Sequence, residues 1–320
     1  MRKFITNSII MKVAVYSVII SVLMLLASCD RDEVFEKEQY KNVFALISES
    51  DNVVRKFHEL GEESVGYVSA SLGGTNPTTE DIVVNMVEDP SLIDRYNLSN
   101  FDVDRSKYIH ALPKDKYHIE SMQFTIKKGE INGRLPITIN PDGLSPDSSY
   151  FIPLRVENFS AYELNPNKSY VLYAVRTKNW WALSDGSSSY NMRSKFKIKG
   201  SLSEINLPGS KVMFPISKNK VRIIAGNEKY ESDVKALYLS AIVLEISEDN
   251  KVTISPYGKI DVKQIDDDKD FPNIFMIEND GFYTYKTFLL HYEYVGTDGT
   301  TYEIKEELRM EYDENEDEQL

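Results

Sequence analysis

Residues 288–294, Phe-Leu-Leu-His-Tyr-Glu-Tyr, alternate between strongly apolar and more polar side chains. A period of two is typical of a β-strand, because successive side chains of a strand point to opposite faces of the sheet. The side chains that share a face with Phe288 would be buried, and those that share a face with His291 would lie on a wetter side. This stretch predicts a strand of an antiparallel sheet with one face in the core.

The second half of the chain repeats such short apolar or alternating segments. We expect strands over residues 195–205, 211–217, 220–226, 235–247, 251–256, 272–278, 282–295 and 301–312. Turn residues such as Thr297-Asp298-Gly299 separate them at hairpin length. Consecutive hairpins predict an up-and-down antiparallel meander, and a meander closes most easily as a small β-barrel of lipocalin-like form over residues 195–312.

The first half predicts a β-sandwich over residues 42–178. Its segments recur at sandwich spacing over residues 43–48, 64–72, 81–88, 119–128, 132–140, 149–157 and 169–178. Asp89-Pro90 precedes residues 91–96 with a capping carboxylate and a proline at the first helical position, which predicts one short helix across an end of the sandwich. Residues 49–60 leave two alternatives open, a second short helix or a loop.

Two segments do not follow either pattern. Residues 179–194 lack periodicity and are interpreted as the linker between the domains, and residues 313–320 form an acidic tail. Twenty tyrosines and fourteen phenylalanines favour strands throughout. The sequence therefore predicts an all-β protein with two domains, each large enough to bury its own core.

The N-terminus reads as a lipoprotein signal peptide over residues 1–28. A charged start at Met1, or at the second candidate start Met11, precedes an apolar run that ends in Leu26-Ala27-Ser28-Cys29, and this ending resembles the lipobox cleaved by lipoprotein signal peptidase. Cys29 is the only cysteine in the chain, so no disulfide holds the fold and its thiol is available for acylation. We expect a lipid anchor, palmitate included, on Cys29, followed by a polar tether over residues 29–41.

The charges near the anchor and in the whole chain indicate location and partners. Asp30-Arg31-Asp32-Glu33 resembles the surface-export signal of Bacteroidetes lipoproteins, whereas an Asp at this place in other Gram-negative envelopes indicates retention at the inner membrane. We expect an outer-membrane protein exposed at the cell surface. Removal of the signal peptide takes away three basic residues and no acids, which changes the net charge from −13 to −16. A mature protein with this negative charge repels the phosphate backbone of nucleic acids, which argues against nucleic acid as a ligand.

Several motifs resemble one family. They are Ser91-Leu92-Ile93-Asp94-Arg95-Tyr96-Asn97, Leu112-Pro113-Lys114-Asp115-Lys116-Tyr117, Phe124-Thr125-Ile126-Lys127-Lys128-Gly129, and Tyr150-Phe151-Ile152-Pro153-Leu154 ahead of Tyr170-Val171-Leu172. Over residues 38–178 the chain resembles the N-terminal domain of unknown function of Bacteroidetes surface lipoproteins encoded in polysaccharide-utilisation loci, a domain that also precedes the catalytic domain of some chitinase-like endoglycosidases. The second half, with Phe288–Tyr294, resembles the β-barrel domain that commonly follows it in non-enzymatic members. The resemblance implies an Ig-like first domain and a role near glycan capture, and it supplies no binding residues.

Catalytic and metal-binding patterns are weak in this sequence. The histidines have no metal-binding spacing, and no nucleophile elbow or phosphate-binding glycine loop is present. Asp266–Asp270 lacks the alternating spacing of a calcium loop and is interpreted as a solvated loop. The fifty acidic residues are enough to supply the pair of carboxylates that a glycosidase uses. The second half, however, does not show the alternating pattern of an α/β barrel. We predict no enzyme, cofactor or metal, and a hydrolase is the least favoured function.

The sharpest functional hypothesis is a sugar platform in the predicted linker. Flat aromatic rings stack on the apolar faces of sugars, and amide and carboxylate groups bond their hydroxyls. The candidate residues are Trp180, Trp181 and Tyr190 for the rings and Asn179, Asp185 and Asn191 for the polar groups. Packing is the favoured alternative, because adjacent tryptophans in a strand face opposite ways and tryptophan at a domain junction is commonly buried.

The combined interpretation is a non-catalytic surface lipoprotein that assists glycan binding in an outer-membrane uptake complex. The alternative of another class is a structural or protein-interaction subunit that contacts a transporter or a partner lipoprotein. An open aromatic platform would favour glycan, and a flat apolar patch would favour a protein partner.

Overall fold

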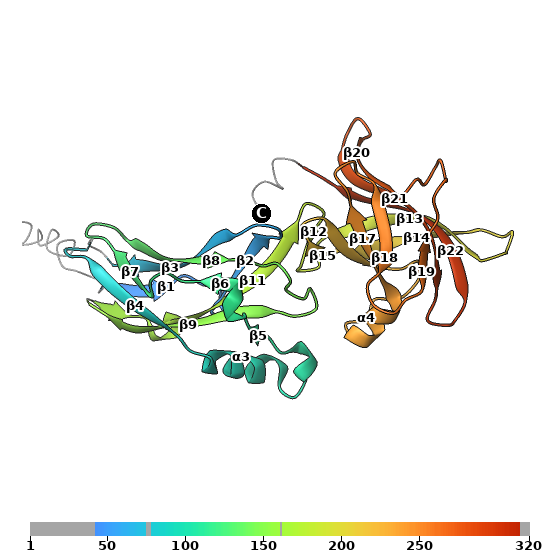
Figure 1. The fold of residues 1–320 in the computed structure, drawn as a ribbon. Coiled ribbons are helices and arrows are strands. Elements are labelled where there is room, and N and C mark those ends of the chain that lie inside the picture. Colours follow the sequence, from blue (N-terminus) through green and yellow to red (C-terminus); the bar gives the residue numbers. More distant parts are fainter. Residues whose placement is uncertain (1–41, 75–77, 161, 314–320) are drawn as a thin grey trace, which may run out of the picture.

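The computed structural model describes residues 42–74, 78–160 and 162–313. The chain is almost entirely β and forms two domains that meet near β12 and β15 (Figure 1). The predicted signal peptide, Cys29, the tether and all of the acidic tail except Asp313 lie outside the described residues. Within the described ranges, no helix is long and apolar enough to cross a membrane.

The N-terminal domain packs two sheets face to face. The first has the order β10 (Glu163–Leu164), β1 (Val43–Leu46), β3 (Ser64–Gly73), β8 (Asn132–Ile139) and β6 (Tyr117–His118). The second has the order β12 (Ala182–Leu183), β11 (Tyr170–Asn179), β9 (Tyr150–Phe159), β4 (Ile82–Glu88) and β7 (Gln123–Ile126), with β2 (Val53–Glu59) on β11 and β5 (His110–Ala111) on β9. Alternate residues of β3, such as Val68 and Ala70, are buried between the sheets, as the period-two pattern predicts.

The predicted helix is present and slightly longer than expected. Helix α3 (Ser91–Phe101) begins with Pro90 at the N-cap rather than at the first helical position, and the Asp89 carboxylate accepts hydrogen bonds from the Ser91 amide at 3.1 Å and the Ser91 hydroxyl at 2.6 Å. Leu92 and Ile93 pack on the outer face of the second sheet. Strands β9 and β11 are therefore buried on both faces, which explains their nearly continuous apolar sequence. Short 3₁₀ turns at Arg105–Lys107, Lys114–Lys116 and Pro166–Lys168 complete this domain.

Both alternatives for residues 49–60 are wrong. Strand β2 pairs in parallel with β11, from Val53 opposite Leu172 to Glu59 opposite Lys178. The partner lies more than a hundred residues away, and a parallel pairing needs a long crossover that no local turn signal announces. The charged pair Arg55-Lys56 also interrupts the alternation of β2.

The far end of β2 contains a buried polar cluster. His58 is buried, its Nδ1 lies 2.6 Å from the Ser64 hydroxyl, and its Nε2 lies 3.1 Å from the Tyr173 hydroxyl. Burial lowers the pKa of His58 to about 4. The ring is therefore neutral in the folded protein at pH 7.

Stability is expected to fall as the pH drops from about 6.5 toward 4, because the unfolded chain then binds a proton at His58 that the folded chain does not. The loss attributable to His58 between pH 7 and pH 5 is about 2 kcal/mol. Urea unfolding at both pH values measures it, and His58→Gln should show a smaller loss. The same pH dependence in wild type and in His58→Gln would contradict this assignment, and His110→Gln, on the exposed β5, is the control.

The C-terminal domain consists of two curled half-barrel sheets around one core. One has the order β14 (Ile205–Val212), β13 (Ser189–Ile198), β22 (Thr301–Glu311), β21 (Thr284–Val295) and β19 (Val262–Gln264), with β20 (Ile274–Asn279) also on β21. The other is the meander β15 (Phe214–Ser217), β16 (Lys220–Ile224), β17 (Ala241–Ile246) and β18 (Val252–Pro256). The first strand, β13, pairs with the last, β22, and contacts between β18 and β19 and between β14 and β16 bring the two sheets together.

The expected strand over residues 195–205 covers the end of β13 and the turn that leads into β14. Two further details of this half differ from expectation. Residues 235–247 were expected as one strand, whereas helix α4 (Val234–Ser240) precedes β17. The apolar run around Leu237 has no period that separates strand from helix, and Leu237 becomes buried as part of the helix. On β21, Phe288, Leu290 and Tyr292 are buried as expected, but His291 is also buried, between the carboxylates of Asp268 and Glu303.

Candidate functional site

Residues 179–194 are ordered. Strand β11 ends at Asn179, the chain turns through the two tryptophans, and β12 pairs back on β11 with Leu183 opposite Lys178. Strand β13 then begins at Ser189, inside the segment interpreted as a linker. The turn is thereby held where the two domains meet (Figure 1).

Asn179 fixes this turn and has no capacity left for a ligand. Its side-chain oxygen accepts from the amides of Trp181 at 3.1 Å and Ala182 at 3.0 Å. Its side-chain nitrogen donates to the carbonyls of Ser217 at 2.8 Å and Lys220 at 3.0 Å. These four bonds use the full capacity of the amide and tie the turn to the hairpin of β15 and β16.

A second contact fixes the two domains against each other. The buried guanidinium of Arg222 in β16 pairs with the carboxylate of Asp147, from the N-terminal domain. The Tyr257 hydroxyl donates to the other oxygen of this carboxylate at 2.7 Å. The guanidinium carbon also lies 4.9 Å from the ring centres of both Tyr257 and Phe214. We call Asp147, Arg222 and Tyr257 the domain clamp.

Two of the three predicted ring residues serve packing. Tyr190 is fully buried, its hydroxyl donates to the Trp181 carbonyl at 2.8 Å, and its ring meets Phe288 edge-on at 5.7 Å. Trp181 is half-buried against Phe275, with ring centres 5.8 Å apart and planes at 89°. Tyr190 therefore offers no ring face to a ligand, and the packing alternative describes both residues.

Trp180 is the exposed aromatic residue of the turn. The residue is 45% exposed, and its ring meets Tyr312 edge-on at 5.1 Å. The Lys286 ammonium lies 4.4 Å from the Trp180 ring centre and donates to the Trp180 carbonyl at 2.8 Å. These contacts fix the orientation of the indole while leaving almost half of its surface accessible.

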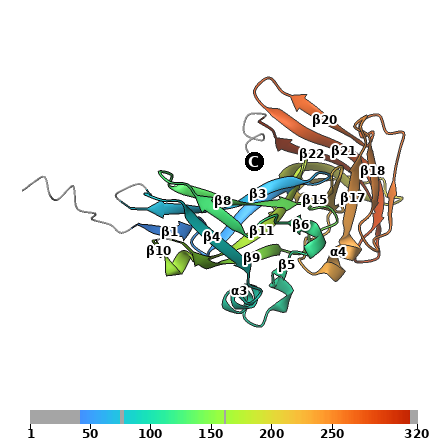
Figure 2. The same ribbon diagram turned by 60° about the vertical axis from the view of Figure 1, so that its left-hand side comes forward.

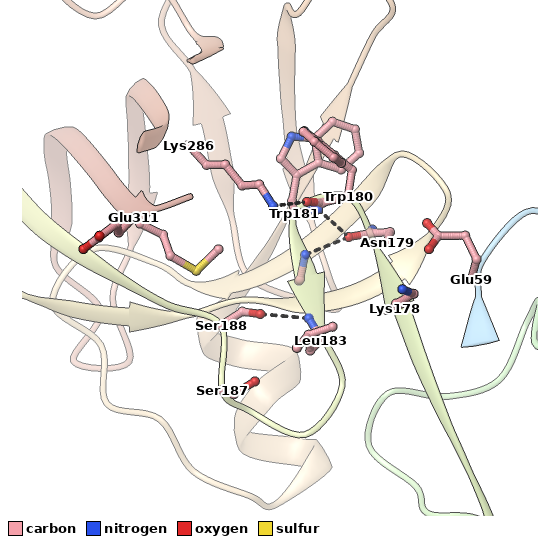
Figure 3. A pocket seen from close by; sticks show the side chains of 12 residues that line it. Glu59, Lys178, Asn179, Trp180, Trp181, Leu183, Ser187, Ser188, Lys286 and Glu311 are labelled. Atoms are coloured by element: carbon pink, nitrogen blue, oxygen red, sulfur yellow. Dashed lines mark hydrogen bonds between the residues drawn. The ribbon is translucent and has the colours of Figure 1, made fainter. Parts of the chain in front are cut away.

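A pocket of about 280 Å³ opens beside Trp180, and Figure 3 shows its lining. Glu59 and Lys178, neighbours across β2 and β11, line it together with Ser187 and Glu311. Burial raises the pKa of Glu59 above its usual range. Within the described residues, neither the Glu59 carboxylate nor the Lys178 ammonium has a hydrogen-bond partner in the protein. The pocket thus combines one open aromatic face with a carboxylate and an ammonium available for hydrogen bonds.

The remaining predicted polar residues lie elsewhere. Asp185 accepts from the Ser187 amide at 3.0 Å, pairs with Arg176 at 3.4 Å and lines a different cleft. Asn191 is exposed on β13 and does not line the Trp180 pocket. Sequence reasoning missed Glu59, Lys178 and Lys286, because each comes from a strand whose pairing is not evident from local sequence.

No catalytic constellation is evident in the described ranges. His58 and His291 are taken up by the contacts given above, and His110 and His118 are exposed on two short strands. Within the same ranges, no group of three or more His, Cys, Asp or Glu residues is placed so that it could hold a metal ion. In the loop Asp266–Asp270, the Lys305 ammonium at 2.6 Å from Asp268 lowers the pKa of that carboxyl to about 2.

The fold is shared with solved proteins from Bacteroides. A protein of unknown function from Bacteroides ovatus is 14% identical with a TM-score of 0.61, over 86% of this chain and 98% of that one. A multidomain protein from the same species that includes a domain of unknown function is 13% identical with a TM-score of 0.61, over 85% and 98%. An auxiliary nutrient binding protein from Bacteroides thetaiotaomicron is 14% identical with a TM-score of 0.54, over 83% and 94%. At these identities the likeness concerns the fold.

Two family models together cover most of the chain, and their boundary falls before β11, although β11 and β12 belong to the second sheet of the N-terminal domain. One, described as an N-terminal domain, matches residues 35–163, and another, described as C-terminal, matches residues 169–309. No curated protein matches the sequence. The chain therefore combines one domain of each of these two models, and its structural neighbours come from Bacteroides.

Proposed function

We propose that this chain is a non-catalytic auxiliary protein that binds glycan at the cell surface within a polysaccharide-utilisation system. The observation that carries the proposal is the exposed Trp180 indole, held by Lys286 and Tyr312 at the rim of a pocket. The neighbour described as an auxiliary nutrient binding protein has the same fold, which is consistent with this role.

The chemistry of the pocket suits a single sugar ring. An indole face covers the apolar C–H face of a pyranose, and the half-buried Glu59 and Lys178 are placed to accept from and donate to its hydroxyls. The volume of about 280 Å³ is small for a ligand pocket, which favours the end of a glycan or one protruding residue over a long segment.

Trp180→Ala is expected to weaken glycan binding by at least tenfold, because it removes the stacking surface. The measurement is affinity electrophoresis of the chain without its first 29 residues, in gels containing soluble starch, yeast mannan, galactomannan or xyloglucan. Trp180→Phe should retain most of the binding, and Tyr67→Ala, which removes an exposed aromatic ring of the N-terminal domain, should bind like wild type. Unchanged retardation of Trp180→Ala in a glycan that retards wild type would rule out this pocket.

The second candidate function is a protein-interaction subunit. The turn that joins β20 and β21 exposes Phe282 and Tyr283, and β20 exposes Ile277 nearby. An exposed apolar tip of this kind fits a protein partner better than a sugar. Lack of retardation in every glycan, together with a partner that is captured by wild type and lost in Phe282→Ser, would favour this function.

Anchoring at Cys29 is part of the proposal. Growth of the native host, or of a bacterium with a lipoprotein pathway, in labelled palmitate should label the wild-type chain and leave Cys29→Ala unlabelled, because the chain has no other cysteine. Protease added to intact cells should also cleave the wild-type chain, because the chain is expected at the cell surface. Equal labelling of Cys29→Ala would contradict the anchor.

A further inference from the structure

Two larger pockets share one residue, Tyr230. The first, of about 530 Å³, lies between the domains and is lined by Lys107 and residues 144–151 on one side and by Tyr230, Ser232 and Asp233 on the other. The second, of about 520 Å³, lies within the C-terminal domain beside β14. Asp185 lines the first and its neighbour Gly186 the second, so the two pockets adjoin along one path. We call this path the Tyr230 groove.

The groove runs over the side of the molecule that carries both helices. Its lining includes Lys107, which follows α3, and Ser232, which precedes α4. Both helices project from the same side of the two domains in Figures 1 and 2. Because Trp180 does not line either pocket, the Tyr230 groove is distinct from the Trp180 pocket.

Tyr230 provides an aromatic platform at the centre of this groove. The residue is 55% exposed. Its ring lies nearly parallel to that of Phe214, with planes at 16° and ring centres 6.0 Å apart. Phe214 in turn contacts the guanidinium of Arg222, which belongs to the domain clamp. The Tyr230 ring therefore packs, through Phe214, against the domain clamp.

The interdomain part of the groove is rich in unused hydroxyls. Ser148, Ser149 and Ser232 line it, and their hydroxyl groups have no hydrogen-bond partner within the described part of the chain. Hydroxyl groups both donate and accept, which suits the hydroxyls of a sugar. Beyond Tyr230 the lining adds the apolar Leu207 and Pro208 to polar residues such as Ser210 and Asn227. A mixture of aromatic, apolar and hydroxyl surface matches the amphipathic faces of sugar rings.

The charges of the groove select against anions. Each cation that lines the interdomain part already has a carboxylate partner: Arg55 with Asp51 at 2.6 Å, Lys107 with Asp104 at 2.9 Å, and Arg176 with Asp185 at 3.4 Å. The Asp233 carboxylate, also in the lining, has no ion-pair partner among the described residues. The whole chain carries a net charge of −13. A uronate or sulfate group would meet no unpaired cation here.

We propose that the Tyr230 groove binds a neutral oligosaccharide segment, with one sugar ring stacked on Tyr230 and its neighbours bonded by the serine hydroxyls between the domains. This inference rests on the proposed glycan binding and extends it from the Trp180 pocket to a second, larger site. The two pockets of the groove each fall within the range of about 300–1,000 Å³ that is usual for small-ligand sites, so together they accommodate several sugar residues.

The test compares four proteins without their first 29 residues: wild type, Tyr230→Ala, Tyr230→Phe and Trp180→Ala. Affinity electrophoresis uses the four neutral polysaccharides named above, with polygalacturonate and chondroitin sulfate as acidic probes. We expect Tyr230→Ala to weaken binding of the neutral glycan at least tenfold while its urea unfolding midpoint stays unchanged, and Tyr230→Phe to bind like wild type. Tyr67→Ala is the matched control for loss of an exposed tyrosine ring.

Each other outcome identifies which claim fails. If Tyr230→Ala binds like wild type while Trp180→Ala does not, the groove is overturned and the proposed function stands. If the acidic probes retard wild type more strongly than the neutral ones, the assignment to neutral glycans is overturned. If no polysaccharide retards wild type, the proposed function fails and the groove with it.

Discussion

Asp147→Ala is expected to lower the free energy of unfolding by about 3–5 kcal/mol, because it leaves the Arg222 charge buried without its partner. Arg222 is only 1% exposed, and Asp147 is its carboxylate partner. The Tyr257 hydroxyl loses its acceptor in the same variant. Most of the effect is the cost of an uncompensated buried charge rather than the net strength of the pair.

Urea unfolding at pH 7 measures this effect, with Asp115→Ala as the control. The Asp115 side chain is 75% exposed, and its removal should change stability by less than about 0.5 kcal/mol. The double variant Asp147→Ala/Arg222→Met should recover much of the lost stability, because no buried charge remains. A loss below about 1 kcal/mol in Asp147→Ala would show that the domain clamp is not a tight, buried contact.

Lys211→Met is expected to cost a similar amount inside the C-terminal domain. The Lys211 ammonium pairs with Glu306, which is fully buried in the core, and the Tyr292 hydroxyl donates to the other carboxylate oxygen at 3.1 Å. Burial lowers the pKa of Lys211 and raises that of Glu306, so each group depends on the other to remain charged. Removal of the lysine alone should destabilise the domain by about 3–5 kcal/mol.

The double variant Lys211→Met/Glu306→Gln distinguishes a lost charge pair from lost packing. A neutral amide at position 306 still accepts from Tyr292 and requires no counter-charge. We expect it to recover at least half of the loss in urea unfolding at pH 7. If the double variant is as unstable as Lys211→Met, packing rather than charge explains the effect.

Alternation in the sequence predicted much of this fold. Strand β21 was evident from residues 288–294, and the Asp89-Pro90 start predicted helix α3. Strand β2 was not predictable, because its pairing with β11 is parallel and distant in sequence. The sequence predicts a strand where helix α4 forms, because a short apolar run has the same composition in both structures.

The candidate site was predictable only in part. Adjacent tryptophans marked the turn between the domains, but local sequence does not determine which ring is exposed. The turn at Asn179 sends Trp181 toward Phe275 in the core and leaves Trp180 at the surface. The groove at Tyr230 was missed entirely, since its lining comes from strands and loops of both domains that only tertiary packing brings together.

The most direct measurement of the central claim is the fluorescence of Trp180 during glycan titration. The chain has two tryptophans, so Trp181→Phe leaves Trp180 as the single indole reporter. Glycan binding at Trp180 predicts that a polysaccharide that retards the protein produces a saturable change in Trp180 emission and protects the indole from quenching by acrylamide. A polysaccharide that binds tightly while Trp180 emission and quenching stay unchanged would contradict it.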